Sequence, residues 1–451
     1  MKIIIAGTGK VGASLARQLT SEGYDITVID SESGVLDTAG EQYDVMTVVG
    51  NCASKSILTA AGVETADLLI AVTGSDEINL LCCLTAHTVN PKLHTIARIR
   101  NPEYASHIYD MRDKFALSMT INPEKQAALE IERLLKYPGF LKLETFAKGR
   151  VEIVELRVDE DSKLCGLSLA EINSVVKCNI LVCSVLREGN VITPSGNFKL
   201  EAGDRIFVTA STDNLTVLLK NLGIITKKVR HVLICGGSRI AYHLSQRLTK
   251  SGINVTIIEK NTEKCLQLSA ALPDVDIINS DATSSFTLEG QGIERCDAIV
   301  ALTGMDEQNI IISLYGHTHK VPNIITKLDH IDDSGILDFL PQSSVVCPKE
   351  LCCNAIVRYV RAMQNQTGAA VAVHLIADGK AEATEFILDK SAPNCGTPLK
   401  ELKLKKGVLI SCITRRGKTE IPNGNSSFTA GDSVVIVTNS GAIHQFGDIF
   451  E

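Results

Sequence analysis

The feature that most constrains this chain is an internal duplication. Residues 2–7 (KIIIAG) correspond to residues 231–236 (HVLICG), and residues 66–79 (ADLLIAVTGSDEIN) correspond to residues 296–309 (CDAIVALTGMDEQN). A third match joins residues 194–204 to residues 422–432, and the offset stays near 229 residues throughout. Because a repeat period of about half the chain is far longer than a solenoid unit, the sequence predicts two copies of one multi-element fold.

Each copy divides into two parts with different hydrophobic patterns. In the first part, short apolar runs such as KIIIAG and DITVID alternate with amphipathic helical stretches, which is typical of a doubly wound parallel sheet. The second part reads as short strands separated by turn residues, with one short helix near LSLAEIN. We therefore expect an α/β fold with tandem Rossmann-like sheets, each followed by a small α+β domain. The expected domains are 1–136, 140–225, 229–363 and 369–451, with linkers near 136–139, 226–228 and 364–368.

Composition excludes several classes of protein. Apolar residues make up 45% of the 451 residues and charged residues 22%, so long disorder is not expected. The net charge of −7 argues against nucleic acid as the main partner. No apolar run approaches the roughly 18 residues that span a bilayer, and the N-terminal run is too short for a signal peptide.

Cysteine and histidine spacing gives no metal or dithiol motif. None of the 14 cysteines forms a CxxC pair, and we expect reduced thiols that act as small core residues of a cytosolic protein. His317 and His319 are two residues apart, a spacing that does not place them on one helix face, so no metal site is expected. The basic cluster of Lys227, Lys228 and Arg230 reads as a solvated linker.

A glycine motif in the first copy carries the strongest chemical signal. Gly7, Gly9 and Gly12 form a GxGxxG pattern that follows a strand and opens a helix. Gly7 permits the tight turn, Gly9 lets the backbone approach a pyrophosphate, and Gly12 allows close helix–strand packing. Asp30 ends the second strand, where its carboxylate accepts hydrogen bonds from both ribose hydroxyls and repels a 2′-phosphate. The first copy is therefore predicted to bind an adenine nucleotide, NAD rather than NADP.

Further site residues follow from topology, because ligands of such sheets lie at the carboxyl ends of the strands. Thr73 is expected to bond a phosphate or ribose, and Arg98 to pair with a phosphate. Asp76 and Glu77 have the alternative of simply favouring a helix N-terminus. The full expected set of the first copy is Gly7, Thr8, Gly9, Lys10, Val11, Gly12, Asp30, Asn51, Cys52, Thr73, Gly74, Asp76, Glu77 and Arg98.

The second copy departs from the glycine pattern. Ser238 replaces the second glycine and adds a side chain where a pyrophosphate would lie, while Ala241 replaces the third. Glu259 keeps a carboxylate at the position of Asp30. Weaker nucleotide binding is expected here, with a scaffold-only domain as the alternative. The expected contacts are Gly236, Ser238, Arg239, Ile240, Glu259, Asp281, Thr303 and Lys327.

This arrangement resembles the TrkA family, the cytoplasmic regulatory subunits of Trk-type potassium uptake systems, whose tandem units are called RCK domains. The resemblance covers nearly the whole chain. In the first copy it rests on the glycine motif, Asp30, the VTGSDEIN stretch and Arg98. In the small domains it rests on two similar sets of residues: Gly166, Leu169, Arg187, Pro194, Gly203 and Asp204, and Gly396, Leu399, Arg415, Pro422, Gly431 and Asp432.

The resemblance implies a gating mechanism. The nucleotide folds would assemble as a dimer or tetramer into a ring beneath a membrane potassium-translocating subunit, with the chain peripheral on the inner face of the membrane. NAD(H), or ATP or ADP, would act as an effector by favouring one ring shape.

Two other functions stay open at the level of sequence. An NAD-dependent oxidoreductase needs a proton donor near the nicotinamide, and no GxSxG, HExxH or Walker lysine is present. The chain is therefore not expected to be an enzyme. A cytosolic sensor without a channel partner, whose small domains bind a separate ligand, is the other alternative.

Overall fold

The computed structural model describes residues 1–136, 140–147, 150–223, 228–329, 343–363, 370–377, 379–439, 443 and 445–451. Within these ranges, no helix has the length and apolar character needed to cross a bilayer. The expected linkers at 137–139, 226–227 and 364–368 lie outside the described residues, as does Lys227 of the basic cluster.

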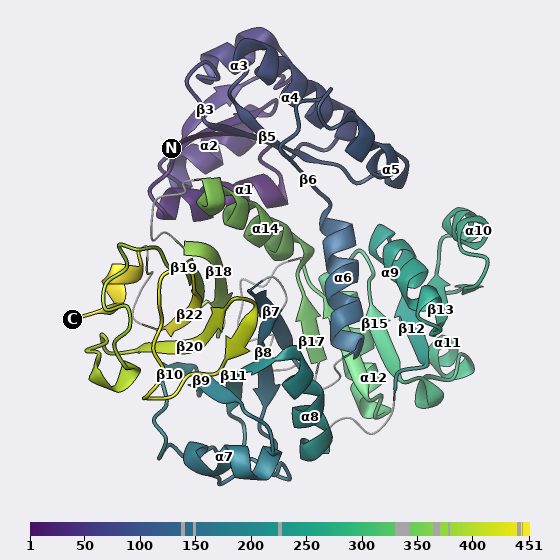
Figure 1. The fold of residues 1–451 in the computed structure, drawn as a ribbon. Helices are drawn as coiled ribbons and strands as arrows, with labels where there is room; N and C mark the ends of the chain where they lie inside the picture. Colours follow the sequence, from purple (N-terminus) through teal and green to yellow (C-terminus); the bar gives the residue numbers. More distant parts are fainter. Residues whose placement is uncertain are drawn as a thin grey trace. The chain divides into compact units, whose positions relative to one another are not determined.

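The first copy opens with a six-stranded parallel sheet in the order β3-β2-β1-β4-β5-β6 (Figure 1). Its strands are β1 (Lys2–Ala6), β2 (Asp25–Asp30), β3 (Met46–Val49), β4 (Leu68–Ala71), β5 (His94–Arg98) and β6 (Met119–Ile121). Its helices are α1 (Lys10–Ser21), α2 (Ser33–Gln42), α3 (Lys55–Ala60), α4 (Asp76–Val89), α5 (Pro102–Met111) and α6 (Pro123–Lys136). This is the expected Rossmann-like order, with β6 added to the strands that the sequence predicts.

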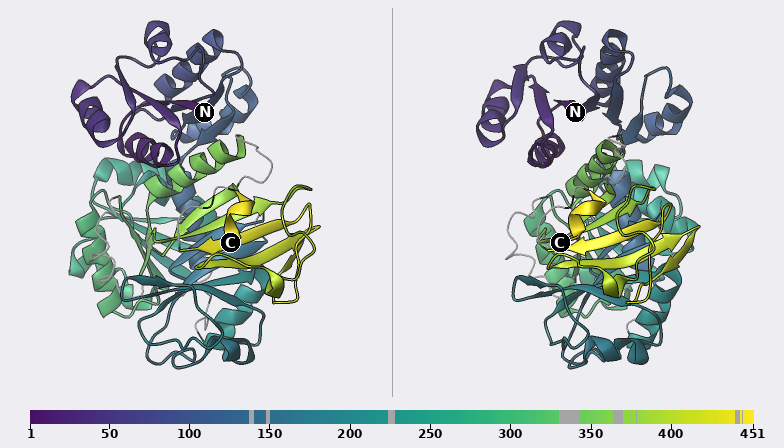
Figure 2. Two further views of the ribbon diagram at one scale, coloured as in Figure 1. Left: turned by 90° about the vertical axis from the view of Figure 1, so that its left-hand side faces the viewer. Right: turned by 60° about the vertical axis from the view of Figure 1, so that its left-hand side comes forward.

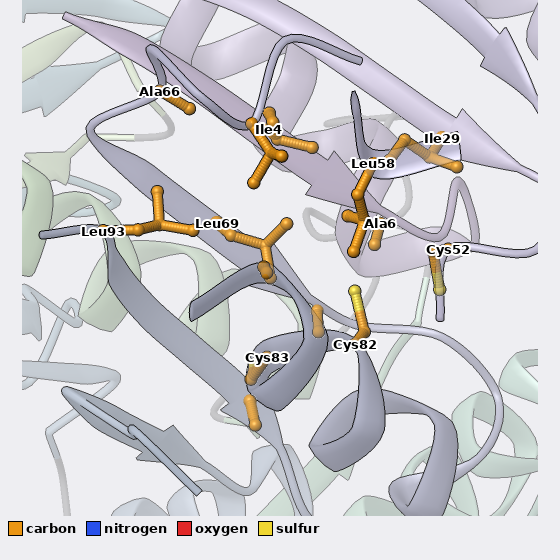
Figure 3. Packing of buried hydrophobic residues seen from close by; sticks show 14 of the residues in the cluster. Ile4, Ala6, Ile29, Cys52, Leu58, Ala66, Leu69, Cys82, Cys83 and Leu93 are labelled. Carbon is orange, nitrogen blue, oxygen red and sulfur yellow. The ribbon is translucent and has the colours of Figure 1, made fainter. Parts of the chain in front are cut away.

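Helices lie on both faces of this sheet (Figure 2), and apolar side chains pack between the sheet and the helices on each face. The central strands β1 and β4 are almost wholly buried because helices cover both sides, whereas the edge strand β3 is largely exposed. On the face of α3 and α4, Ile4, Leu69, Leu58 and Cys83 form one cluster (Figure 3). Helix α1 buries a separate stripe that includes Leu15 and Leu19. The two cores fix the ends of β1 and β4, where the glycine turn lies.

The second copy repeats this parallel sheet in the order β14-β13-β12-β15-β16-β17. Its strands are β12 (His231–Cys235), β13 (Asn254–Glu259), β14 (Asp276–Asn279), β15 (Ala298–Ala301), β16 (Asn323–Lys327) and β17 (Ser343–Val346). Its helices are α9 (Arg239–Lys250), α10 (Thr262–Ala271), α11 (Ser285–Gly290), η1 (Ile293–Arg295), α12 (Asp306–Thr318) and α14 (Pro348–Met363). The two nucleotide folds therefore share one topology, as the duplication predicts.

Each small domain is built on a five-stranded antiparallel sheet. The first has the order β10-β9-β11-β8-β7, and the second has the order β18-β19-β22-β20-β21. The elements of the first are β7 (Lys142–Phe146), β8 (Val151–Arg157), α7 (Leu169–Val176), β9 (Leu181–Arg187), β10 (Asn190–Ile192), β11 (Arg205–Ser211) and α8 (Thr212–Leu222). Those of the second are β18 (Ala370–Ile376), β19 (Ala381–Ile387), η2 (Leu399–Glu401), β20 (Val408–Arg415), β21 (Lys418–Glu420), β22 (Ser433–Thr438) and η3 (Phe446–Ile449). The sequence reading missed β7 and α8.

The two small domains pack against each other through their sheets. One apolar cluster takes members from both, including Ile153 and Phe207 of the first and Ala383 and Val437 of the second. Polar groups also cross this interface, since the Ala147 amide donates to Glu385 at 3.1 Å. The two small domains thus share one hydrophobic core, which the sequence of either domain alone does not predict.

The chain forms two compact units that do not follow the order of the four expected domains. One contains residues 1–127 together with 348–359, and the other contains residues 128–347 and 360–451. Most of α14, which follows the second nucleotide fold in sequence, thus belongs to the unit of the first. There the Cys353 thiol of α14 donates to the Val11 carbonyl of α1.

Candidate functional site

The candidate site lies where the strand order of the first sheet reverses, between β1 and β4. Crossover helices leave the sheet in opposite directions at such a point, which opens a crevice at the carboxyl ends of the strands. The turns after β1, β2, β3 and β4 meet at this edge. They carry the glycine motif, Asp30, Asn51 with Cys52, and Thr73 with Gly74.

The three glycines of the first copy have three different environments. Gly7 has a φ of +100°, and a Cβ there would lie 2.9 Å from the Thr73 Cα. A Cβ on Gly12 would lie 1.8 Å from the Gly7 carbonyl oxygen, so the turn and α1 pack too tightly for any side chain. Gly9 is exposed and has no neighbour within 4 Å of a Cβ position. Packing therefore requires glycine at positions 7 and 12, whereas nothing in the folded chain requires it at Gly9.

The N-terminus of α1 at Gly9 is uncapped by any side chain. The first amides of a helix have no intrahelical acceptor, and with the helix dipole they favour an anion. Open space around Gly9 lets a phosphate approach these donors. The geometry thus fits a pyrophosphate at the start of α1.

Asp30 is tied to the glycine turn by Thr8. Its Oδ2 accepts from the Thr8 amide at 2.7 Å and from the Thr8 hydroxyl at 2.6 Å, while Oδ1 accepts from the Glu32 amide at 3.2 Å. Burial raises the pKa of Asp30, but the hydrogen bonds from Thr8 outweigh it and hold the pKa below its usual value. The carboxylate is therefore ionised and oriented, with lone pairs of Oδ1 left for a ribose hydroxyl.

Asn79 is a structural residue of the site that the sequence reading missed. Its side chain is fully buried, and its Oδ1 accepts from the Thr73 amide and hydroxyl at 2.8 and 2.7 Å. Its Nδ2 donates to the Arg98 carbonyl at 2.9 Å, so one amide joins the ends of β4 and β5. Asn309 makes the same bonds to Thr303 and Lys327 in the second copy. A polar residue kept in both copies on a buried helix face is the signal that could have found it.

Asp76 and Glu77 are bonded to the protein rather than directed to open space. The buried Asp76 accepts from the amides of Arg100 and Asn101 at 2.8 and 2.7 Å. The exposed Glu77 accepts from the hydroxyls of Ser75 and Tyr104. These bonds order the loop after β5 and the start of α4, which favours the structural alternative for both acids.

Arg98 contacts the turn after β4 at the edge of the candidate site. Its guanidinium donates to the Thr73 carbonyl, and burial together with the nearby Arg100 lowers its pKa. The other expected residues lie around the same edge: Asn51, Gly74 and Lys10 are exposed, whereas Val11 and Cys52 are buried.

In the second copy, the start of the helix is capped by the chain itself. Ser238 occupies the position of Gly9, and its hydroxyl accepts from the Ala241 amide at 3.3 Å. Its φ of −78° and ψ of 170° resemble the −62° and −177° of Gly9. The two turns thus have similar backbones at this position, but only the first leaves the helix amide open.

Glu259 fills more of its turn than Asp30 does. Its Oε2 accepts from the Gly237 amide at 2.7 Å and its Oε1 from the Asn261 amide at 2.8 Å. A Cβ at Gly237 would lie 2.7 Å from Leu268 and 3.0 Å from the Glu259 side chain. In the second copy, the pair of Glu259 and Gly237 therefore stands in place of the pair of Asp30 and Thr8. Both carboxylate oxygens of Glu259 accept hydrogen bonds from the turn.

The remaining expected residues of the second copy lie at the same strand ends. Lys327 is buried, with its Nζ 3.3 Å from the Thr303 carbonyl and 3.1 Å from Asp329. Asp281 accepts from the amide and hydroxyl of Thr283, and these bonds lower its pKa. Gly236 has a φ of +108°, Arg239 is exposed and Ile240 is buried.

The residues of the small domains that the family pattern singles out form matching ion pairs. Arg187 donates to both oxygens of the buried Asp204 at 2.7 and 2.8 Å, and Arg415 donates to the buried Asp432 in the same way. Each arginine also bonds a backbone carbonyl. These pairs join the end of β9 to the start of β11 and the end of β20 to the start of β22. Among the described residues, no group of three or more His, Cys, Asp or Glu side chains has the arrangement of a metal site.

Comparison with known proteins gives matches along nearly the whole chain. The model of the TrkA-N domain matches residues 3–118 and 232–348, and the model of the TrkA-C domain matches residues 153–223 and 383–451. The Trk system potassium uptake protein TrkA homolog of Archaeoglobus fulgidus is 31% identical over 450 residues, covering 100% of both chains. The Trk system potassium uptake protein TrkA of Haemophilus influenzae is 31% identical over 452 residues, covering 97% of this chain and 95% of the relative.

Solved structures share the fold. The GsuK RCK domain superposes with a TM-score of 0.63 at 19% identity, covering 97% of this chain and 92% of that one. The GsuK channel bound to NAD gives a TM-score of 0.62 at 19% identity, covering 97% and 77%. Tandem matches to both domain models, together with full-length relatives, confirm the resemblance stated from the sequence: the chain belongs to the TrkA family of Trk potassium uptake proteins.

Proposed function

We propose that this chain is the cytoplasmic regulatory subunit of a potassium uptake system, and that it controls a membrane-embedded potassium-translocating subunit. The observation that carries the proposal is 31% sequence identity, over nearly the full length of the chain, to relatives named as Trk system potassium uptake proteins. The chain assembles with further copies of itself into a ring and lies on the inner face of the membrane through its partner.

The first nucleotide fold is the effector site in this proposal. Its open helix N-terminus at Gly9 binds a pyrophosphate, and Asp30 accepts from the adenosine ribose. An ionised Asp30 repels a 2′-phosphate, so NAD or NADH binds and the 2′-phosphorylated forms do not. ADP and ATP also satisfy the phosphate and ribose contacts. A GsuK structure bound to NAD and another bound to ADP support this choice of ligands.

The second nucleotide fold is a weaker site that does not take a dinucleotide. Ser238 occupies a helix amide that a pyrophosphate needs, and its side chain stands where Gly9 leaves open space in the first copy. We therefore infer one dinucleotide per chain. A mononucleotide that contacts only the outer edge of this crevice is the ligand that remains compatible with it.

The nucleotide acts as an effector and not as a reactant. The carboxylates at the first crevice are bonded to backbone amides and hydroxyls, which suits binding rather than proton transfer. An NAD-dependent oxidoreductase is the competing function. Turnover of NADH with a small substrate would support the oxidoreductase and contradict this proposal.

Calorimetric titration of the full chain with NADH, NAD, NADPH, ATP and ADP tests the binding step. We expect binding of NAD(H) with one site per chain, no binding of NADPH, and loss of affinity in Asp30→Ala. Potassium uptake by vesicles that contain the membrane subunit and the purified chain, with and without NADH and ATP, tests regulation. Flux that is the same with and without the chain at every nucleotide concentration would contradict the regulatory role.

A further inference from the structure

Two cysteines of the first nucleotide fold lie in one buried cluster, and the first of them is near Asp30. Cys52 lies in the turn after β3, and Cys82 lies in the middle of α4, 5% and 0% exposed in the same core cluster. Each thiol affects the ionisation of the other, and Figure 3 shows the two sulfur atoms near each other. Two neighbouring thiols can form a disulfide if an oxidant reaches them.

The two thiols differ in acidity in a way that assigns their roles. The hydrogen bond from Cys82 lowers the pKa of Cys52, against the opposing effects of burial and of the Asp30 charge. The same contact and burial raise the pKa of Cys82. Cys52 also lies in a turn and is the more exposed of the two, so it is the thiol that attacks the oxidant, and Cys82 is the thiol that resolves the product.

No other cysteine of the described residues combines a lowered pKa with a neighbouring thiol that interacts with it. Burial raises the pKa of Cys83, the neighbour of Cys82, to about 12. Cys395 is exposed, but partial burial and the charges of Asp432 and Asp389 raise its pKa. Accessibility alone therefore does not predict which thiol reacts first.

The pair occurs only in the copy whose helix N-terminus is open. Ala282 occupies the position of Cys52 in the second copy, and Ile312 occupies that of Cys82. Alanine and isoleucine fill these places in the same fold, so packing alone does not demand two thiols. In addition, Asp30 lies close enough to Cys52 to affect its ionisation, which places the pair beside the ribose acceptor.

We propose that Cys52 and Cys82 form a redox-active dithiol that hydrogen peroxide converts to an intramolecular disulfide when the nucleotide crevice is empty. The Cys52 thiolate attacks one peroxide oxygen, the O–O bond breaks, and the released hydroxide takes up a proton as water. The Cys82 sulfur then attacks the Cys52 sulfenic acid, and the S–O bond breaks with loss of a second water. Two thiols and one peroxide thus give one disulfide and two waters.

A nucleotide in the crevice protects this pair. Adenosine bound at Asp30 covers the turn that carries Cys52, a step that rests on the nucleotide binding proposed above. Only empty chains are then oxidised. The disulfide joins the turn after β3 to α4, the helix whose Asn79 holds the ends of β4 and β5. Oxidation would thus fix both sides of the crevice in the nucleotide-free chain.

The test treats the full, nucleotide-free chain with hydrogen peroxide and follows intact mass and peptide maps over time. We expect loss of two hydrogens and a cross-link between the Cys52 and Cys82 peptides before Cys395 is modified. The variant Cys52→Ala carries the residue of the second copy and should fold but form no cross-link. The variant Cys83→Ala is the matched control and should still form it. Modification of Cys395 first, or Cys52 oxidised without the cross-link, would overturn the dithiol.

A second arm repeats the oxidation with NAD, whose binding is measured separately by calorimetry. At about ten times its Kd, NAD leaves about one chain in eleven empty, so cross-linking should slow about tenfold. If NAD binds and the rate is unchanged, protection is wrong. If NAD fails to bind while the cross-link still forms, the proposed nucleotide site fails and the dithiol stands.

Discussion

Gly9→Ser converts the first nucleotide turn to the form found in the second copy. The φ and ψ of Gly9 are close to those of Ser238, and a Cβ at Gly9 meets nothing within 4 Å. The new hydroxyl should accept from the Gly12 amide, as Ser238 accepts from Ala241. The substitution therefore changes the availability of one helix amide and the space beside it without disturbing the apo fold.

Two opposite effects of this change can be sized. Serine is a slightly better N-cap than glycine, so the free energy of unfolding should stay within a few tenths of a kcal/mol of the parent, or rise. A phosphate loses one charge-assisted bond, worth about 1.5–3 kcal/mol. At 1.4 kcal/mol per tenfold, the Kd for NADH should rise roughly tenfold to a hundredfold.

Calorimetric titration with NADH and a thermal unfolding scan measure both effects on the same sample. Ser238→Gly is the matched control, and it should leave the affinity of the first site unchanged. Unaltered NADH affinity in Gly9→Ser would refute the assignment of the pyrophosphate to the start of α1. A large drop in unfolding temperature would refute the claim that Gly9 is free of packing constraints.

Three further predictions concern stability. Gly12→Ala places a Cβ 1.8 Å from the Gly7 carbonyl oxygen, so the turn must move. We expect the free energy of unfolding in urea to fall by about 3 kcal/mol and NADH to bind more weakly. Stability and affinity equal to those of the parent would contradict the packing. Asn79→Ala removes the acceptor of the Thr73 amide and hydroxyl and the donor to the Arg98 carbonyl, all partly buried. It should cost about 3 kcal/mol in the same assay, and a loss below about 1 kcal/mol would count against the clamp. Burial raises the pKa of Asp432, but hydrogen bonds from Arg415 outweigh burial, so the pKa in the folded chain is lowered. The stability that this pair contributes is therefore present above the unfolded pKa of 3.8 and is lost as the pH falls through the lower folded pKa. Urea midpoints measured from about pH 5 to 2 should fall less steeply in Arg415→Met than in the parent, and parallel curves would contradict the pair's contribution.

The sequence by itself determined the architecture and pointed to the centre of the candidate site. Residue patterns repeated at one offset predicted two similar folds, and alternating apolar runs and amphipathic helices predicted the parallel sheets, because burial on both faces leaves a local pattern. The glycine spacing and the acid at the end of the second strand located the turn at Gly7 and Asp30, since backbone conformation and strand ends are set by nearby residues.

Only the tertiary structure decided which groups meet. Strands β6 and β7 are too short or too mixed in polarity to be predicted, and they form because neighbouring strands supply hydrogen bonds. Asn79 becomes a clamp and Cys52 meets Cys82 because the sheet brings the ends of separate strands and helices together. Ser238 and Gly9 differ by one side chain in the sequence, but the fold shows that this side chain takes the helix amide that the first copy leaves open. Such pairings depend on distances between residues far apart in the chain, which a local pattern does not record.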